Sequence, residues 1–229
     1  MTERSYRTDF PRDENPISEN GAWLNGKKDG VDWADVIAKD GRAYGAVTRM
    51  AVAERRAEQA ALGAGSSEES LPEGDYDDPT AVLTGDWGRN QHVRARVFSK
   101  NPTNRYFQEV EIRLRSEIKP KWCSGYEVFW RCLKTDEGYA EIVRWNGKVG
   151  DFTSLRKLIG SEYGVEDGDE VEAHIVGNRI RGLVNSRELI SATDDVFPSG
   201  APGIGFNFFV GNTNVDHGFT HFEVNTDDD

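Results

Sequence analysis

Residues 125–145 read GYEVFWRCLKTDEGYAEIVRW, and this stretch decides the fold. Two alternating runs flank the polar residues 134–138, which predicts two antiparallel strands joined by a five-residue turn. Side chains alternate between the faces of a strand, and directly opposed residues share a face. One face of the hairpin is therefore apolar. It comprises Tyr126, Val128, Trp130, Cys132, Ala140 and Ile142.

The other face of this hairpin combines aromatic rings with charged groups, namely Glu127, Arg131, Tyr139, Glu141 and Trp145. The five-residue turn sets a register in which Arg131 faces Glu141 and Glu127 faces Trp145. Aromatic rings pack on the apolar faces of sugars, and charged groups bind hydroxyls and carboxylates. The face is therefore typical of a sugar-binding sheet. The alternative is a solvated sheet face with a cross-strand ion pair.

From residue 80 onward, short alternating runs punctuated by Gly, Asn and Asp recur, and they predict an all-β sandwich. Gly177-Asn178 and Asn185-Ser186 have the composition of tight turns. Two segments are expected to be helical, 50–62 and 153–159. An acidic, Gly/Ser-rich stretch follows the first of them, so residues 50–74 are predicted to be a helical, partly mobile insertion.

The 229 residues fit one domain spanning 1–229. The formal net charge of −12 argues against a nucleic-acid partner and against an anionic membrane surface. No run approaches the roughly 18 apolar residues of a membrane span. No signal peptide is visible, so we expect a cytoplasmic protein or a trimmed secreted one. The Ala-rich insertion offers a surface for a protein partner or for self-association.

The two cysteines, Cys123 and Cys132, flank a single predicted strand. In an extended chain they lie about 30 Å apart. A disulfide requires Cα atoms within about 7 Å of each other. Both are therefore predicted to be free thiols.

The strand at 106–116 supplies further candidate residues. Its alternation places Val110, Ile112 and Leu114 on a core face, and Glu109, Glu111 and Arg113 on the opposite face. Two acids spaced like this are about 7 Å apart at the backbone, so their carboxyl groups can reach the separations used by retaining or inverting glycosidases. If this strand lies beside the hairpin, these residues share a groove with Arg131 and Glu141. Otherwise the strand is a charge-balanced surface stripe.

The order of these pieces resembles the concanavalin A-like lectin/glucanase superfamily, which includes LamG-like jelly rolls. The residues that carry the resemblance are Asp9-Phe10, NGAW at 20–23, Gly125-Tyr126, EIVRWNG at 141–147, DFTSL at 151–155, GIGF at 203–206 and FTHFEV at 219–224. The resemblance implies a two-sheet antiparallel jelly-roll β-sandwich. This fold hosts lectins, hydrolases, lyases and adhesion modules alike. The E-x-D-x-x-E strand of laminarinase-type glucanases and the R-x-x-x-R motif of alginate lyases are absent.

The resemblance implies an oligo- or polysaccharide partner, and the polar faces supply the candidate residues. The catalytic candidates are Glu109, Glu111, Arg131, Tyr139 and Glu141, and the substrate-binding candidates are Arg113, Glu127, Trp145 and His221. The resemblance also implies a structural Ca²⁺ near the terminal strands, for which Asp9, Asn214 and Asp216 offer oxygen ligands. No other cofactor is expected.

The leading prediction is carbohydrate recognition, extended to cleavage by a glycoside hydrolase or a polysaccharide lyase. In a lyase, Tyr139 would serve as the base only with a cationic neighbour such as Arg131, because an unperturbed tyrosine has a pKa near 10. The alternatives are a non-catalytic lectin-like binding module and a structural or adhesion domain of a larger assembly.

Overall fold

The computed structural model describes residues 3–26, 29, 33–45, 78–102, 108–120, 122–148, 150–208 and 214–228. These residues form antiparallel β-strands and one 3-10 turn, η2 (Asn214–Asp216). The predicted helix at 50–62 and the insertion at 50–74 lie outside the described residues. Among the described residues, no helix has the length and apolar character needed to cross a membrane.

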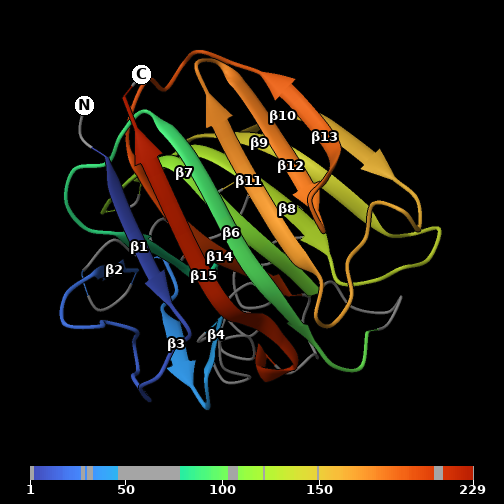
Figure 1. Ribbon diagram of the computed structural model, residues 1–229, viewed down its shortest axis with the longest axis horizontal. Coiled ribbons are helices and arrows are strands. Elements are labelled where there is room, and N and C mark those ends of the chain that lie inside the picture. The colour runs from blue at the N-terminus through green and yellow to red at the C-terminus, as the bar shows by residue number, and fades with distance from the viewer. Residues whose placement is uncertain are drawn as a thin grey trace, which may run out of the picture.

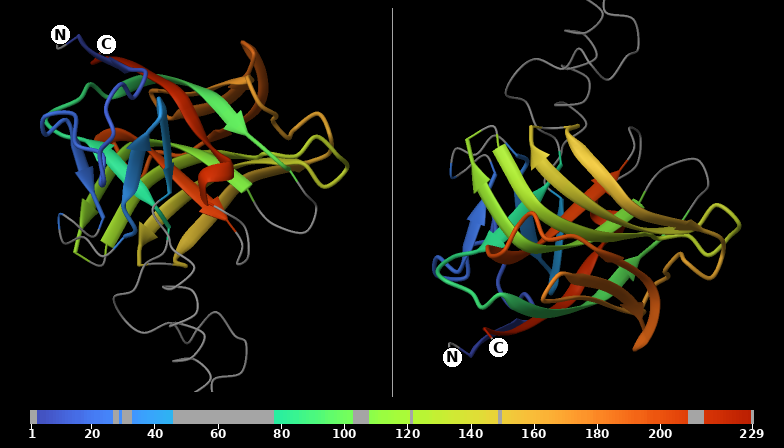
Figure 2. Two further views of the ribbon diagram at one scale, coloured as in Figure 1. Left: turned by 90° about the horizontal axis from the view of Figure 1, so that it is seen from below. Right: turned by 90° about the horizontal axis from the view of Figure 1, so that it is seen from above.

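The strands form two sheets, which Figure 2 shows as two packed layers. The eight-stranded sheet has the order β13 (Arg187–Thr193), β12 (Arg179–Val184), β11 (Glu170–Val176), β6 (Asn90–Ser99), β15 (His217–Asp227), β4 (Arg42–Gly45) and β3 (Val36–Lys39), with β1 (Arg4–Thr8) also paired to β15. The long strands β6 and β15 cross its centre in Figure 1.

The seven-stranded sheet has the order β10 (Phe152–Ile159), β9 (Tyr139–Gly147), β8 (Trp122–Arg131), β7 (Gln108–Lys119), β14 (Ala201–Phe208), β5 (Thr80–Leu83) and β2 (Trp23–Asn25). Every strand pair in both sheets is antiparallel. The predicted all-β, two-sheet antiparallel sandwich is therefore confirmed.

The main core lies between the sheets. The predicted apolar faces of β7, β8 and β9 all belong to it, including the fully buried Trp130, Ile112 and Ile142. Burying each such side chain contributes about 1.5–3 kcal/mol relative to leaving it exposed. A second, smaller cluster lies on the opposite face of the seven-stranded sheet. It comprises Trp33, Val82, Ile118, Cys123, Val143 and Trp145. Both cysteines are buried and free, as predicted.

The two predicted tight turns are confirmed. Gly177-Asn178 connects β11 to β12, and Gly177 has a φ of +59°. Asn185-Ser186 connects β12 to β13 as a two-residue loop, with φ values of +49° and +64°. Two successive positive φ angles match the right-handed twist of the flanking strands, which is the reason such turns dominate short hairpins.

The prediction of a helix at 153–159 is wrong, because this segment forms β10 along the edge of β9. A bulge between Ser154 and Arg156 interrupts its register. One extra residue turns the strand period of two into a spacing of three. Leu155 and Leu158 consequently both reach the main core, and their spacing imitates a helical face.

The predicted register of the β8–β9 hairpin is wrong by two residues. Phe129 lies opposite Glu141, and Gly125 lies opposite Trp145. The connection is longer than predicted, because the ladder ends at Trp130, opposite Ala140, and the Arg131 carbonyl accepts the N–H groups of Leu133 and Val165 instead. A shift of two residues leaves each side chain on its predicted face, because side chains alternate with a period of two. A shift of one residue would have moved one strand's side chains to the opposite faces.

Candidate functional site

We call the side of the seven-stranded sheet that is turned away from the main core the outer face. Strands β7, β8 and β9 are neighbours there, pairing Glu109 with Arg131 and Arg113 with Glu127. The predicted strand at 106–116 therefore does lie beside the hairpin, within its described part. Eight candidates share this face: Glu109, Glu111, Arg113, Glu127, Arg131, Tyr139, Glu141 and Trp145.

The outer face is buried rather than solvated. Arg113 is 0 % exposed, and even Trp145 is only 8 % exposed. The alternative of a solvated sheet face with an exposed ion pair is therefore wrong. Removing charges from water costs several kcal/mol per ion unless each is paired and hydrogen-bonded, so the partners of these groups decide what the face can do.

One cluster surrounds the guanidinium of Arg113, and we call Arg113, Asp78, Glu111 and Glu127 the Arg113 group. Arg113 Nη1 lies 3.0 Å from Glu127 Oε2, whereas Nη2 lies 3.4 Å from Asp78 Oδ2 and 3.7 Å from Glu111 Oε2. Burial disfavours the charged guanidinium, but Glu127 and the other acids outweigh it and raise the pKa of Arg113.

Aromatic rings enclose the Arg113 group. The guanidinium carbon lies 5.1 Å from the ring centroid of Trp33 and 5.6 Å from that of Trp145. Trp145 Nε1 donates a 2.7 Å hydrogen bond to Glu127 Oε2. The two indole rings are also in edge contact, 5.1 Å apart. Trp145 is therefore a buried wall of this group, not the open stacking surface that its sequence position suggests.

The second cluster centres on Glu109 and Tyr139, and the Tyr139 hydroxyl donates to Glu109 Oε1. Burial, and then the charge of Glu127, raise the pKa of Glu109 to about 7. Lys157 Nζ lies 4.4 Å from the Tyr139 ring centroid. A carboxyl group with a pKa near neutrality can both give and take a proton at physiological pH.

Glu141 does not pair with Arg131, which corrects the predicted cross-strand ion pair. Glu141 instead accepts hydrogen bonds from Ser154 Oγ at 2.6 Å and from Lys157 Nζ at 2.7 Å, both on β10. Arg131 Nη1 lies 3.1 Å from the carbonyl oxygen of Glu137 and 3.5 Å from its carboxylate. The register shift separates the two partners by bringing Glu141 opposite Phe129.

The outer face reaches solvent along β10, and we call Phe152, Ser154 and Lys157 the β10 edge. Phe152 is 48 % exposed, and its ring centroid lies 5.5 Å from that of Trp145. The Lys157 side chain is 43 % exposed. Sequence reasoning missed this edge because the bulge disguised β10 as a helix. It also missed Asp78 and Trp33, which come from segments far from the hairpin in sequence.

His221 does not join the other candidates. It lies on β15 of the eight-stranded sheet, where its Nδ1 is 2.6 Å from Asp9 Oδ1. That hydrogen bond to His221 lowers the pKa of Asp9. Within the described residues, neither Asp9 nor Asp216 belongs to a three-membered group of acidic, His or Cys ligands. The side chain of Asn214 is outside the described part, so the Ca²⁺ site at these three residues stays a prediction.

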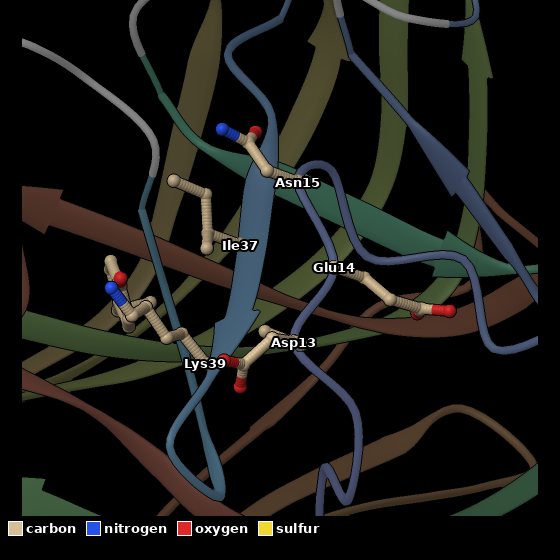
Figure 3. A pocket seen from close by; sticks show the side chains of 7 residues that line it. Asp13, Glu14, Asn15, Ile37 and Lys39 are labelled. Carbon is tan, nitrogen blue, oxygen red and sulfur yellow. The ribbon is translucent and has the colours of Figure 1, made fainter.

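A surface pocket lies elsewhere, at the β3 edge of the eight-stranded sheet (Figure 3). Its lining residues are Asp13, Glu14, Asn15, Ile37, Ala38, Lys39 and Tyr44. The acids there serve the local backbone, since Glu14 Oε2 accepts the N–H groups of Ser18 and Glu19. No residue of the outer face lines this pocket, so it is not the candidate site.

No protein-family model and no curated protein matches the sequence. Its fold resembles carbohydrate-binding module CBM66 from Bacillus subtilis, with a TM-score of 0.52, 14% identity and coverage of 92% of this chain and 96% of that chain. It also resembles a Bacillus licheniformis β-glucanase, with a TM-score of 0.51, 11% identity and coverage of 97% and 98%.

A third similar structure comes from work on endo-acting O-glycanases that prominent members of the human gut microbiota express to initiate mucin breakdown. Its TM-score is 0.55 at 10% identity, with coverage of 97% of this chain and 99% of that chain. These structures are concanavalin A-like jelly rolls. The predicted fold is thereby confirmed, and at such low identities the likeness establishes the fold alone.

Proposed function

We propose that this concanavalin A-like jelly roll binds an oligo- or polysaccharide along the β10 edge of its outer face. The observation that carries the proposal is the exposed ring of Phe152 beside the buried ring of Trp145. A pyranose can stack on the open Phe152 ring through its apolar C–H face. Glu141, Ser154 and Lys157 then lie on the neighbouring positions to bind hydroxyl groups.

A carbohydrate-binding module and a glucanase share this fold, which supports a saccharide as the ligand class. The face offers no basic stripe, since acids outnumber bases across it, and this agrees with the −12 net charge in disfavouring nucleic acid. A solvated structural surface would not bury four glutamates and two arginines in one sheet face. We therefore place recognition ahead of a purely structural role.

Glycan cleavage is the second candidate, and Glu109 favours it. Its pKa of about 7 makes it a proton donor matched to neutral pH. The Tyr139 hydroxyl holds its carboxyl group in place. Glu141 on the same strand as Tyr139 supplies a second carboxylate, as hydrolysis requires. For this chemistry the bound glycan must extend inward from the β10 edge across Tyr139.

The binding proposal is tested by affinity electrophoresis and calorimetry on a panel of polysaccharides. Phe152→Ala should weaken binding by roughly 1–3 kcal/mol, taking aromatic stacking of nucleic-acid bases as the analogue. Phe98→Ala is the matched control, because Phe98 is a partly exposed ring in the eight-stranded sheet, 4.4 Å from Arg42. Equal binding by the wild type and Phe152→Ala would remove the β10 edge from consideration.

Product analysis separates the two candidates. New reducing ends without unsaturated products indicate hydrolysis, and unsaturated uronide products indicate a lyase. Glu109→Gln should abolish either activity while leaving binding at the β10 edge largely intact, since Glu109 lies further into the face. Binding without any product would leave a lectin-like module as the function.

A further inference from the structure

Three carboxylates meet at one point in the Arg113 group. One oxygen each of Asp78, Glu111 and Glu127 lies within 4.8 Å of the others. Glu111 and Glu127 are 2 % and 3 % exposed, and the Asp78 side chain is 17 % exposed. They come from β7, β8 and the residues that precede β5, so the fold itself assembles them.

Acids outnumber bases in the Arg113 group. Within the group itself, three carboxylates face one guanidinium, and the two glutamates are almost fully buried. Arg113 makes one close contact, at 3.0 Å to Glu127, and the contacts at 3.4 and 3.7 Å are longer than the roughly 2.7–2.9 Å of a good charge-assisted hydrogen bond.

Glu111 gives an independent indication that this cluster binds a ligand. Its Oε2 is fully buried and makes no hydrogen bond, although it is the oxygen that points toward Arg113. Buried polar atoms in native proteins almost always have a partner. A Cβ at position 205 would lie 2.2 Å from this same oxygen, so glycine at this position is what allows Glu111 to reach the cluster.

We propose that Asp78, Glu111 and Glu127 bind a hard divalent cation, with Ca²⁺ as the representative. Such an ion takes carboxylate oxygens at about 2.3–2.6 Å, and three ligands around one ion are then separated by less than about 5 Å. The oxygens here meet that condition. The ion would add two positive charges beside the three carboxylates.

Two neighbouring donors hold one of the proposed ligands in place. Arg113 and Trp145 Nε1 both contact Glu127 Oε2, at 3.0 and 2.7 Å. Such contacts orient a ligating carboxylate and leave its other oxygen to the ion.

This proposal does not depend on the proposed function. The ligands lie on β7, β8 and the segment before β5, whereas the sugar contacts lie on β9 and β10. Cation binding can be measured without any glycan, so a failure of either proposal leaves the other standing.

Terbium luminescence tests the site directly. Tb³⁺ binds the oxygen ligands of Ca²⁺ and emits when a nearby indole is excited, and Trp145 hydrogen-bonds to one proposed ligand. We expect tryptophan-sensitised emission from the wild type that Ca²⁺ reverses by competition. Glu111→Gln should lose most of this emission. Glu172→Gln is the matched control, because Glu172 is a partly buried carboxylate on β11 of the other sheet.

Thermal unfolding provides a second readout of cation binding. A cation that binds only the folded chain should raise the midpoint of the wild type by about 5–10 °C at a hundredfold excess over its Kd, relative to the chain in EDTA. Glu111→Gln should show no such shift. Should Glu111→Gln fail to fold, Asp78→Asn, at a partly exposed ligand, serves instead.

Two results would overturn the proposal. One is a wild-type midpoint that Ca²⁺, Mg²⁺ and Mn²⁺ at millimolar concentration all leave unchanged from its value in EDTA. The other is Tb³⁺ emission that is equal in Glu111→Gln and the wild type. In either case the three carboxylates would be held together without a metal ion.

Discussion

At the scale of single residues, Glu109 makes the free energy of unfolding depend on pH. Burial raises its pKa from 4.5 to about 7, so the folded chain binds more protons than the unfolded chain between these values. The free energy of unfolding must then fall as the pH rises from about 4.5 to 7, and stay lowered above that window.

Glu109→Gln should remove this penalty, because glutamine is never charged and its carbonyl still accepts the Tyr139 hydroxyl. We expect the variant to gain at most about 3 kcal/mol over the wild type above pH 7, and little at pH 4.5. Denaturant titrations at several pH values measure the difference. A gain that is independent of pH would show that Glu109 is not the group that titrates.

Trp145 contributes through its ring nitrogen as well as its packing. Trp145→Phe keeps most of the buried ring but leaves the Glu127 carboxylate with one donor fewer. We expect a loss of about 1–3 kcal/mol in the free energy of unfolding. Trp87→Phe is the control, because its Nε1 bonds the exposed carbonyl of Thr84 and should cost less. Equal losses would mean that the Glu127 bond adds nothing.

At the scale of elements, alternation predicted which residues share a face but not how strands are aligned. The period of two placed Val128, Trp130 and Ile142 in the core correctly. It could not reveal that the β8–β9 ladder ends at Trp130, since the bond from the Val165 N–H to the Arg131 carbonyl is long-range. Nor could it distinguish a bulged strand from a helix at β10.

The alternation of side chains within single strands also could not predict that the outer face is buried. Trp33 and Asp78 reach Arg113 from 80 and 35 positions away in sequence. Side-chain alternation shows that Arg113 points away from the core, and it predicts solvent there by default. Only the tertiary arrangement shows which groups meet the guanidinium.

The β12–β13 turn gives a prediction at the scale of the hairpin. Ser186 has a φ of +64°, a conformation that costs a residue with a Cβ about 1–2 kcal/mol. Ser186→Gly relieves that strain and creates Asn-Gly, the preferred pair for this turn. Part of the gain is lost to glycine's greater freedom in the unfolded chain.

The net gain from Ser186→Gly should be about 0.5–1 kcal/mol, or roughly 1–4 °C in the unfolding midpoint. Asn185→Gly is the control, because asparagine tolerates positive φ well and should gain less. A lower midpoint for Ser186→Gly than for the wild type would contradict the turn geometry.

At the scale of the whole molecule, the two apolar clusters differ greatly in size. Cys132 belongs to the main core between the sheets, whereas Cys123 belongs to the small cluster on the outer face. Each thiol is 0–1 % exposed, and burial raises the pKa of each to about 12. Neither should react with a thiol reagent while the chain is folded.

The small cluster should open without separating the sheets, because it lies outside the main core and local openings need less free energy than global unfolding. We therefore expect Cys123 to be labelled at a lower denaturant concentration than Cys132. The variants Cys132→Ser and Cys123→Ser each leave one thiol. Mass spectrometry of each variant then gives the labelling rate of the thiol that remains. Labelling of both thiols in a single step, coincident with the loss of sheet structure by circular dichroism, would show that the outer face and the sandwich unfold as one unit. In that case the buried charges of the outer face would belong to the folding core itself, rather than to a layer that opens to admit a ligand.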